Sequence, residues 1–223
     1  MEKIKSIPFI LFISGVPCVG KTTISYKLLE DYPFFKRITE LDMIKTVIRS
    51  IIKENENFRL NDDFNCLLSS TTDNNYDTFK QQALVLSRYV KEIVVRQKKR
   101  CIPTIIEGIN IIPSVYFKDS VPVEGFKDNV LFINLYISDE QEHIRRRFDR
   151  CKERNYTLSD DQIKEKIFKY KEKNFLLHKE TLELSNKVNN VFSIDISGMS
   201  QNSIVTIIEK IMNDYLESIL LIK

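Results

Sequence analysis

The chain has 223 residues, which suits one α/β domain with a short inserted lid better than two full domains. Hydrophobic residues make up 43% of the chain and charged residues 29%, the balance of a globular protein with a hydrated surface. The net charge of +3 is too small to indicate nucleic-acid binding by itself, and it is compatible with an anionic small-molecule substrate. No apolar run approaches the ~20 residues of a membrane span, so we expect no membrane partner.

The cysteines and histidines favour a reducing compartment. The four cysteines are far apart and form no C-x-x-C pair, and the chain has only two histidines, so neither a disulfide framework nor a zinc site is expected. The first residues, Met1-Glu2-Lys3, do not have the pattern of a signal peptide. We therefore expect a cytoplasmic protein.

Strand-like and helix-like segments alternate along the chain. Apolar periodicity predicts strands at 9–13, 37–39, 104–107, 130–137 and 191–194, and helices at 21–30, 42–53, 76–99, 139–154, 159–187 and 200–220. This alternation is typical of a parallel sheet with helices on both faces. We expect a single domain over residues 1–223, with a lid at about 139–160. Two stretches rich in Asn and Asp, 55–65 and 71–77, are predicted to be mobile loops.

Residues 15–22 form a complete phosphate-binding loop with the spacing G-x-x-x-x-G-K-[ST]. A predicted strand precedes this P-loop and a predicted helix follows it, so backbone N–H groups can cradle phosphates at a helix N-terminus. Lys21 is expected to reach the β- and γ-phosphates, and the Thr22 hydroxyl to ligate Mg²⁺. The pattern predicts a site for ATP and Mg²⁺ that is formed by Gly15, Val16, Pro17, Cys18, Val19, Gly20, Lys21, Thr22 and Thr23.

A polar stripe begins where the second predicted strand ends. Asp42, Lys45 and Arg49 share one face of the helix predicted at 42–53, and we expect this face to point toward the phosphates. Asp42 is predicted to accept a proton from an attacking hydroxyl, and Arg49 to hold an anionic group of the acceptor. The alternative is a helix-starting acid with surface cations. Apolar residues of the same helix are expected to pack on the opposite side: Met43, Val47 and Ile51.

A second acid ends the third predicted strand. Glu107 ends a β-branched run. A carboxylate at the end of such a strand can orient Mg²⁺ or its water. Gly108 would let the backbone approach a ligand closely, and Asn110 follows in the same loop. We predict that Glu107 binds metal and that Glu107, Gly108 and Asn110 contact the acceptor. The alternative is a strand-ending acid that faces solvent.

The helix predicted at 139–154 carries a row of arginines. Arg147, Arg150 and Arg154 lie on one face at three- and four-residue spacing. Phosphoryl transfer depends on cations that close over the transferred group, and the arginine fork suits phosphate. We predict that this helix is an arginine-rich lid in which Arg147 and Arg150 are catalytic. The alternative is a solvated basic face whose arginines pair with acids of the same helix.

These segments together resemble the 2-phosphoglycerate kinase family of P-loop small-molecule kinases. The resemblance lies in residues 39–49, in residues 107–113 and in the start of the lid helix with Arg147 and Phe148. It implies a five-stranded parallel sheet of the nucleotide-kinase type and ATP-dependent phosphorylation of a hydroxyl on a small, usually anionic, acceptor. The leading acceptor is 2-phosphoglycerate. The chain departs from the family pattern at Cys18, Lys45 and Asn110.

Two other functions fit the same P-loop. One is a kinase for nucleotides, nucleosides or polynucleotide 5′ ends, which would bind oligonucleotides in a salt-sensitive way. The other is a nucleotide-gated regulatory ATPase, whose hydrolysis a protein partner would stimulate. The arginines on one helix of this chain favour cations supplied in cis, and so favour the small-molecule kinase.

Overall fold

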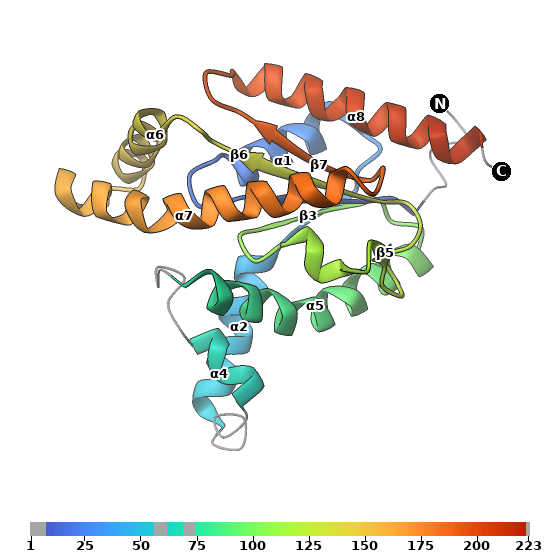
Figure 1. Ribbon diagram of the computed structural model, residues 1–223, viewed down its shortest axis with the longest axis horizontal. Helices are drawn as coiled ribbons and strands as arrows, with labels where there is room; N and C mark the ends of the chain where they lie inside the picture. Colours follow the sequence, from blue (N-terminus) through green and yellow to red (C-terminus); the bar gives the residue numbers. More distant parts are fainter. Residues whose placement is uncertain (1–7, 56–61, 69–74, 222–223) are drawn as a thin grey trace.

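The computed structural model describes residues 8–55, 62–68 and 75–221 (Figure 1). Its centre is a five-stranded sheet in the order β2-β3-β1-β6-β7, in which every pairing is parallel. The strands are β1 (Ile10–Ser14), β2 (Arg37–Glu40), β3 (Thr104–Gly108), β6 (Val130–Tyr136) and β7 (Val191–Asp195). The predicted five-stranded parallel sheet is therefore confirmed.

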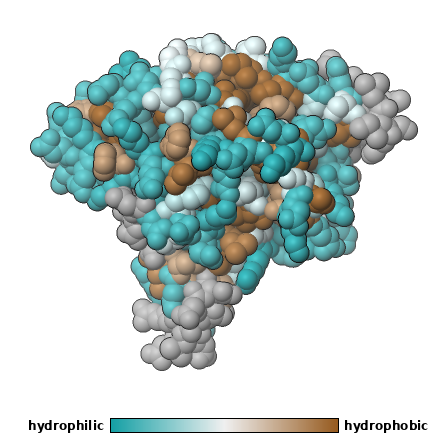
Figure 2. Space-filling model, viewed as in Figure 1, coloured by the Kyte–Doolittle hydropathy of each residue, from teal (hydrophilic) through white to brown (hydrophobic). Residues whose placement is uncertain are grey.

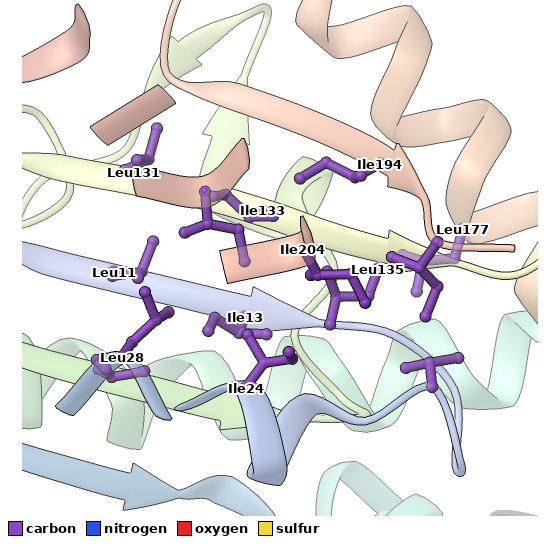
Figure 3. Close-up of a cluster of buried hydrophobic side chains, with 14 of the residues drawn as sticks. Leu11, Ile13, Ile24, Leu28, Leu131, Ile133, Leu135, Leu177, Ile194 and Ile204 are labelled. Carbon is purple, nitrogen blue, oxygen red and sulfur yellow. The ribbon is translucent and has the colours of Figure 1, made fainter. Parts of the chain in front are cut away.

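Helices pack on both faces of the sheet, as Figure 1 shows with α8 above it and α5 below it. The helices are α1 (Lys21–Asp31), α2 (Leu41–Glu54), α4 (Asp62–Leu68), α5 (Tyr76–Lys99), α6 (Glu140–Glu153), α7 (Asp160–Ser185) and α8 (Gln201–Leu221). Side chains of β1 alternate between two cores because successive residues of a strand point to opposite faces. Leu11 and Ile13 pack with residues of α1 and α8 (Figure 3). Phe12 belongs instead to the second core, which includes residues of α5. Both faces are covered, which is why every residue of β1 is buried.

Side-chain caps fix where two of the long helices begin. Asp139 precedes α6, and its carboxylate accepts hydrogen bonds from the backbone N–H groups of Gln141 and Glu142 at 2.9 and 3.1 Å. Ser159 precedes α7 and forms a capping box with Gln162. These caps satisfy backbone N–H groups that have no partner inside the helix. The lid helix thus starts directly beyond the carboxyl end of β6.

The orientation of α2 differs from the prediction. Met43, Val47 and Ile51 were expected to pack inward, but they are 62%, 58% and 50% exposed. Lys45, from the polar stripe, is instead only 3% exposed. The helix carries a second apolar stripe at helical spacing, and this stripe packs against β3 and α4. It consists of Leu41, Ile44, Ile48 and Ile52. Because Lys45 is adjacent to this stripe, it enters the protein interior with it.

Two connections contain structure that the sequence pattern does not predict. The predicted loop at 55–65 includes the start of α4, so that prediction was wrong for residues 62–65. The predicted loop at 71–77 was wrong for Tyr76 and Asp77, which are the first residues of α5. Residues 56–61 and 69–74, which include most of the rest of both predicted loops, lie outside the described residues. Between β3 and β6 the chain forms a 3₁₀ turn, Pro113–Tyr116, and the two-stranded hairpin of β4 (Phe117–Lys118) and β5 (Val121–Pro122).

The described helices are too short or too polar to cross a membrane. Figure 2 shows a mainly hydrophilic face, with apolar side chains visible in the region of α8.

Candidate active site

The P-loop connects β1 to α1 through backbone conformations that few residues adopt. Gly15 has φ +142°, and a Cβ at this position would lie 2.6 Å from the carbonyl oxygen of Leu135. Gly20, which precedes α1, has φ +92°, in the left-handed region that favours glycine. Cys18 also lies in the left-handed region, with φ +70°. The chain therefore turns tightly enough to bring successive backbone N–H groups around one point at the N-terminus of α1.

Lys21 places its amine inside this loop. It is 8% exposed, and its Nζ donates a hydrogen bond to the carbonyl oxygen of Val16 at 3.1 Å. Burial lowers the pKa of Lys21, while the nearby carboxylates of Asp42 and Glu107 act to raise it. The loop thus combines backbone donors with a lysine amine that two carboxylates approach. This set of groups fits a triphosphate with its bound cation.

Thr22 and Glu107 form the candidate metal-binding pair. The Thr22 hydroxyl donates to Glu107 Oε1 at 2.8 Å. The register of the sheet explains this contact, because Ile13 of β1 lies opposite Glu107 of β3. Burial raises the pKa of Glu107, whereas Lys21 and the Thr22 hydrogen bond lower it. A hydroxyl and a carboxylate oxygen are hard ligands of the kind that Mg²⁺ prefers. The residues present therefore fit Mg²⁺.

A cavity of about 200 Å³ brings together residues from separate parts of the chain. The P-loop contributes Lys21 and Thr22, β3 contributes Glu107, and the first turn of α2 contributes the exposed Asp42. The remaining wall comes mainly from α6 and α7. Its residues are Pro17, Arg147, Arg150, Cys151, Arg154, Tyr156 and Tyr170. The cavity lies at the carboxyl ends of the strands, where ligands of open α/β sheets bind.

A larger cavity of about 520 Å³ extends from the other side of the P-loop. The start of α1, including Thr23, forms one wall, and arginines of α6 form another. The loop after β7 and the start of α8 complete it with Met199, Ser200, Gln201 and Ile204. A cavity of this size beside the phosphate loop can hold the ribose and base of a nucleotide.

The arginines of α6 divide into two groups. Arg146 forms an ion pair with Glu142 at 2.7 Å, and Arg145 lies 3.8 Å from the same carboxylate. Arg146 also donates to the P-loop carbonyl of Val19 at 3.4 Å. In contrast, Arg150 lines both cavities and has no carboxylate partner within the described residues. The alternative interpretation of the helix, pairing with its own acids, therefore applies to Arg145 and Arg146.

Arg147 and His143 connect α6 to the P-loop. The Arg147 guanidinium donates to Cys18 Sγ at 3.8 Å. His143 is 2% exposed, and its Nε2–H donates to the carbonyl oxygen of Pro17 at 2.8 Å. Burial lowers the pKa of His143, so its ring stays neutral at pH 7. Sequence reasoning missed the role of His143, because the two partners are 126 residues apart and nothing in the helix pattern distinguishes this side chain.

Three predicted acceptor-side residues do not line either cavity. Arg49 donates through Nε to the carbonyl oxygen of Leu67, and Asn110 is fully buried. Gly108 makes room for α2, because a Cβ there would lie 2.7 Å from the Cβ of Leu41. The roles of Arg49, Gly108 and Asn110 in acceptor binding stay predictions.

No protein-family model matches the chain. The chain is 24% identical over 164 residues to 2-phosphoglycerate kinase of Methanothermobacter thermautotrophicus. That match covers 66% of this chain and 48% of the relative, so the chain spans about half the length of the curated relative.

Solved structures share the architecture at low sequence identity. Thymidylate kinase from Candida albicans has a TM-score of 0.53 and 15% identity, over 93% of this chain and 92% of that one. Shikimate kinase from Acinetobacter baumannii, solved with shikimate, has a TM-score of 0.51 and 13% identity, over 96% and 97%. An uncharacterized protein from Eubacterium ventriosum has a TM-score of 0.51 and 10% identity, over 93% and 99%. The protein therefore has the P-loop kinase fold.

Proposed function

We propose that this protein is an ATP-dependent kinase that phosphorylates a hydroxyl of a small anionic metabolite, with 2-phosphoglycerate as the leading candidate. The observation that carries the proposal is the cavity in which Lys21, Asp42 and Arg150 meet. The similarity to 2-phosphoglycerate kinase, 24% identity over 164 residues, supports the choice of acceptor.

MgATP bound at the P-loop would supply the γ-phosphoryl group. The loop N–H groups and Lys21 provide the positive field that holds negatively charged oxygens. Thr22 and Glu107 would hold Mg²⁺, an assignment supported by the 2.8 Å hydrogen bond between their oxygens. The buried position of Lys21 strengthens its interaction with an anion, because a low-dielectric environment screens charge weakly.

Asp42 is the candidate base for the acceptor hydroxyl. Its carboxylate lines the cavity and lies close enough to Lys21 to raise the pKa of that amine. A carboxylate beside the transferred group can orient a hydroxyl and accept its proton as the new O–P bond forms. Asp42 is also near the start of α2, so a small shift of this end of the helix would move its carboxylate.

Arg147 and Arg150 are the candidate groups for charge stabilisation. Both line the cavity, and the charge of Arg150 acts on Lys21 to lower its pKa. A guanidinium can donate two parallel hydrogen bonds to phosphoryl oxygens. Because α6 follows β6 directly, these arginines belong to the same chain as the P-loop, and the cations are supplied in cis.

The test is a screen of purified protein with Mg²⁺ and ATP against phosphorylated hydroxy acids, sugars and nucleosides, read by mass spectrometry of the products. We expect a phosphorylated hydroxy acid, and no product with Lys21→Ala. The matched control is Lys27→Ala, which removes a lysine of the same helix that pairs with Asp31 on the surface. ADP without a phosphorylated product would instead indicate an ATPase. A 5′-phosphorylated nucleoside would indicate a nucleoside kinase.

A further inference from the structure

Helix α7 presents a row of apolar side chains to solvent. Phe168, Phe175 and Leu182 are 65%, 54% and 41% exposed, and they recur at intervals of seven residues. Seven residues are close to two helical turns, so the three side chains lie in one row along the helix. The residues that α7 buries lie on the opposite side of the helix and include Ile167, Tyr170, Leu177, Thr181 and Leu184. This row, the α7 stripe, therefore faces away from the core.

The α7 stripe differs from scattered apolar exposure. Single exposed apolar residues are common on protein surfaces, whereas a row with a period of seven is the pattern that two helices bury when they pack at a small angle. From Phe168 to Leu182 the stripe is ~21 Å long, at a rise of ~1.5 Å per residue. In the view of Figures 1 and 2, hydrophobic side chains are visible among hydrophilic ones in the region of α7. A second helix laid along α7 would cover the whole stripe.

One acid and one base lie within the α7 stripe. Glu172 and Lys179 are exposed, and each follows an apolar residue of the stripe by four positions, on the same side of the helix. Neither has an ion-pair partner within the part of the chain that the structure describes. Other charges beside the stripe are already paired: Lys171 with Glu140 at 2.7 Å and Lys169 with Glu165 at 2.6 Å. The stripe therefore offers one negative and one positive group to a partner.

The order of these two charges favours a second copy of the same helix. In an antiparallel pair centred near Phe175, Glu172 of one copy lies opposite Lys179 of the other, because the two residues flank the centre at similar distances. The two-fold axis repeats the contact, so the pair contains two acid–base contacts. A parallel pair would instead set glutamate against glutamate and lysine against lysine, which is unfavourable. The stripe is thus self-complementary in the antiparallel orientation.

We propose that the α7 stripe is a homodimer interface in which two copies of this chain pack their α7 helices antiparallel. Phe175 lies at the two-fold axis, and Phe168 of each copy packs on Leu182 of the other. A contact made by one helix from each copy is at the small end of specific interfaces, so the dimer is weak, with a Kd of about 10–100 μM. None of the proposed catalytic residues belongs to the stripe, so this inference does not rest on the proposed function.

Sedimentation velocity of the full chain, from about 1 μM to about 300 μM, tests the dimer. We expect the average sedimentation coefficient to rise with concentration from the monomer value toward the dimer value. Phe175→Ser should raise the Kd about tenfold or more, because it removes the apolar contact at the axis from both copies. The matched control is Leu84→Ser, which changes a 45% exposed residue of α5 and should leave the Kd unchanged.

Exchange of the two charges tests the orientation. Glu172→Lys and Lys179→Glu should each raise the Kd about tenfold, because each variant sets like charges against each other twice in the antiparallel dimer. The double variant Glu172→Lys/Lys179→Glu should restore the Kd of the unmodified chain, since every contact again joins an acid to a base. Single variants that leave the Kd unchanged would contradict antiparallel pairing.

Two results would overturn the interface itself. One is a chain that stays monomeric over the whole concentration range. The other is a dimer whose Kd does not respond to Phe175→Ser, because its interface would then lie elsewhere. Melting temperatures measured at about 1 μM, where the chain is monomeric, should be the same in all variants, since the substituted side chains are exposed. A weaker dimer in a variant with an unchanged Tm therefore reports the contact and not the fold.

Discussion

The proposed donor side and the proposed acceptor side of the site are held together by different kinds of contact. The P-loop holds Lys21 through a bond to Val16, five residues away in the chain. On the predicted acceptor side, Lys45 is held by Gln82 and Asn110, which are 37 and 65 residues away. Local backbone geometry therefore forms the proposed phosphate site, whereas tertiary packing positions the side chains that are predicted to lie on the acceptor side. This difference explains why the donor can be inferred from one motif and the acceptor cannot.

The largest expected effect is on the donor side. Lys21→Ala should lower kcat by about 10³-fold or more with any acceptor, because it removes the cation at the transferred group. The measurement is the rate of phosphorylated product formation, with Lys27→Ala as the control. A Lys21→Ala variant that retained most of its turnover would show that the P-loop is not the donor site.

Asp42→Asn tests the point where the two sides meet. We expect kcat to fall by about 10²-fold or more, because the amide cannot accept the hydroxyl proton. ATP binding, measured by calorimetry, should change little. Asp31→Asn is the control, as Asp31 is a surface acid that pairs with Lys27. Near-normal turnover in Asp42→Asn would remove this residue from the mechanism.

Arg150 and Arg146 of α6 are predicted to have different roles. Arg150 takes part in catalysis, and Arg146 supports the P-loop. Arg150→Ala should lower kcat by about 10²-fold with little change in Tm, because Arg150 has no carboxylate partner among the described residues and lines both cavities. Arg146→Ala should lower Tm instead, because it removes the ion pair at 2.7 Å from the nearly buried carboxylate of Glu142. Equal effects of the two substitutions on kcat and Tm would contradict this division.

The smallest expected effect concerns the pH dependence of stability. Lys45 has a pKa of about 7 when folded against 10.5 when unfolded, so between these values the unfolded state binds more protons. Lys45 should therefore make the free energy of unfolding rise with pH across this window by about 1 kcal/mol per pH unit. Urea denaturation at several pH values measures the slope. Lys45→Met should lack this contribution and Lys53→Met should keep it. Equal slopes in all three proteins would mean that Lys45 is not a buried titrating amine.

The sequence was sufficient to predict the architecture of the sheet and the position of the site. Because the carboxyl ends of parallel strands meet at one edge, Asp42, Glu107 and Arg147 could be expected near the P-loop, and the structure brings them together. Their chemical roles stay predictions until turnover is measured.

The orientation of α2 and the role of His143 could not be predicted in the same way. The helix carries two apolar stripes at helical spacing, and only packing against β3 and α4 decides which one is buried. His143 reaches Pro17 because β6 and β1 are neighbours in the sheet, a relation that the order of segments along the chain does not give. The same cause hides the contacts of Lys45 with Gln82 and Asn110, which come from α5 and from the loop after β3.

The most direct test of the proposed phosphoryl transfer is ³¹P NMR of one reaction that contains the protein, MgATP and the panel of hydroxy acids. We predict a phosphomonoester signal that grows as fast as the γ-phosphorus signal of ATP declines, and neither change in Asp42→Asn. Conversion of the γ-phosphorus only to inorganic phosphate, at the same rate in both proteins, would contradict phosphoryl transfer to an acceptor at this cavity.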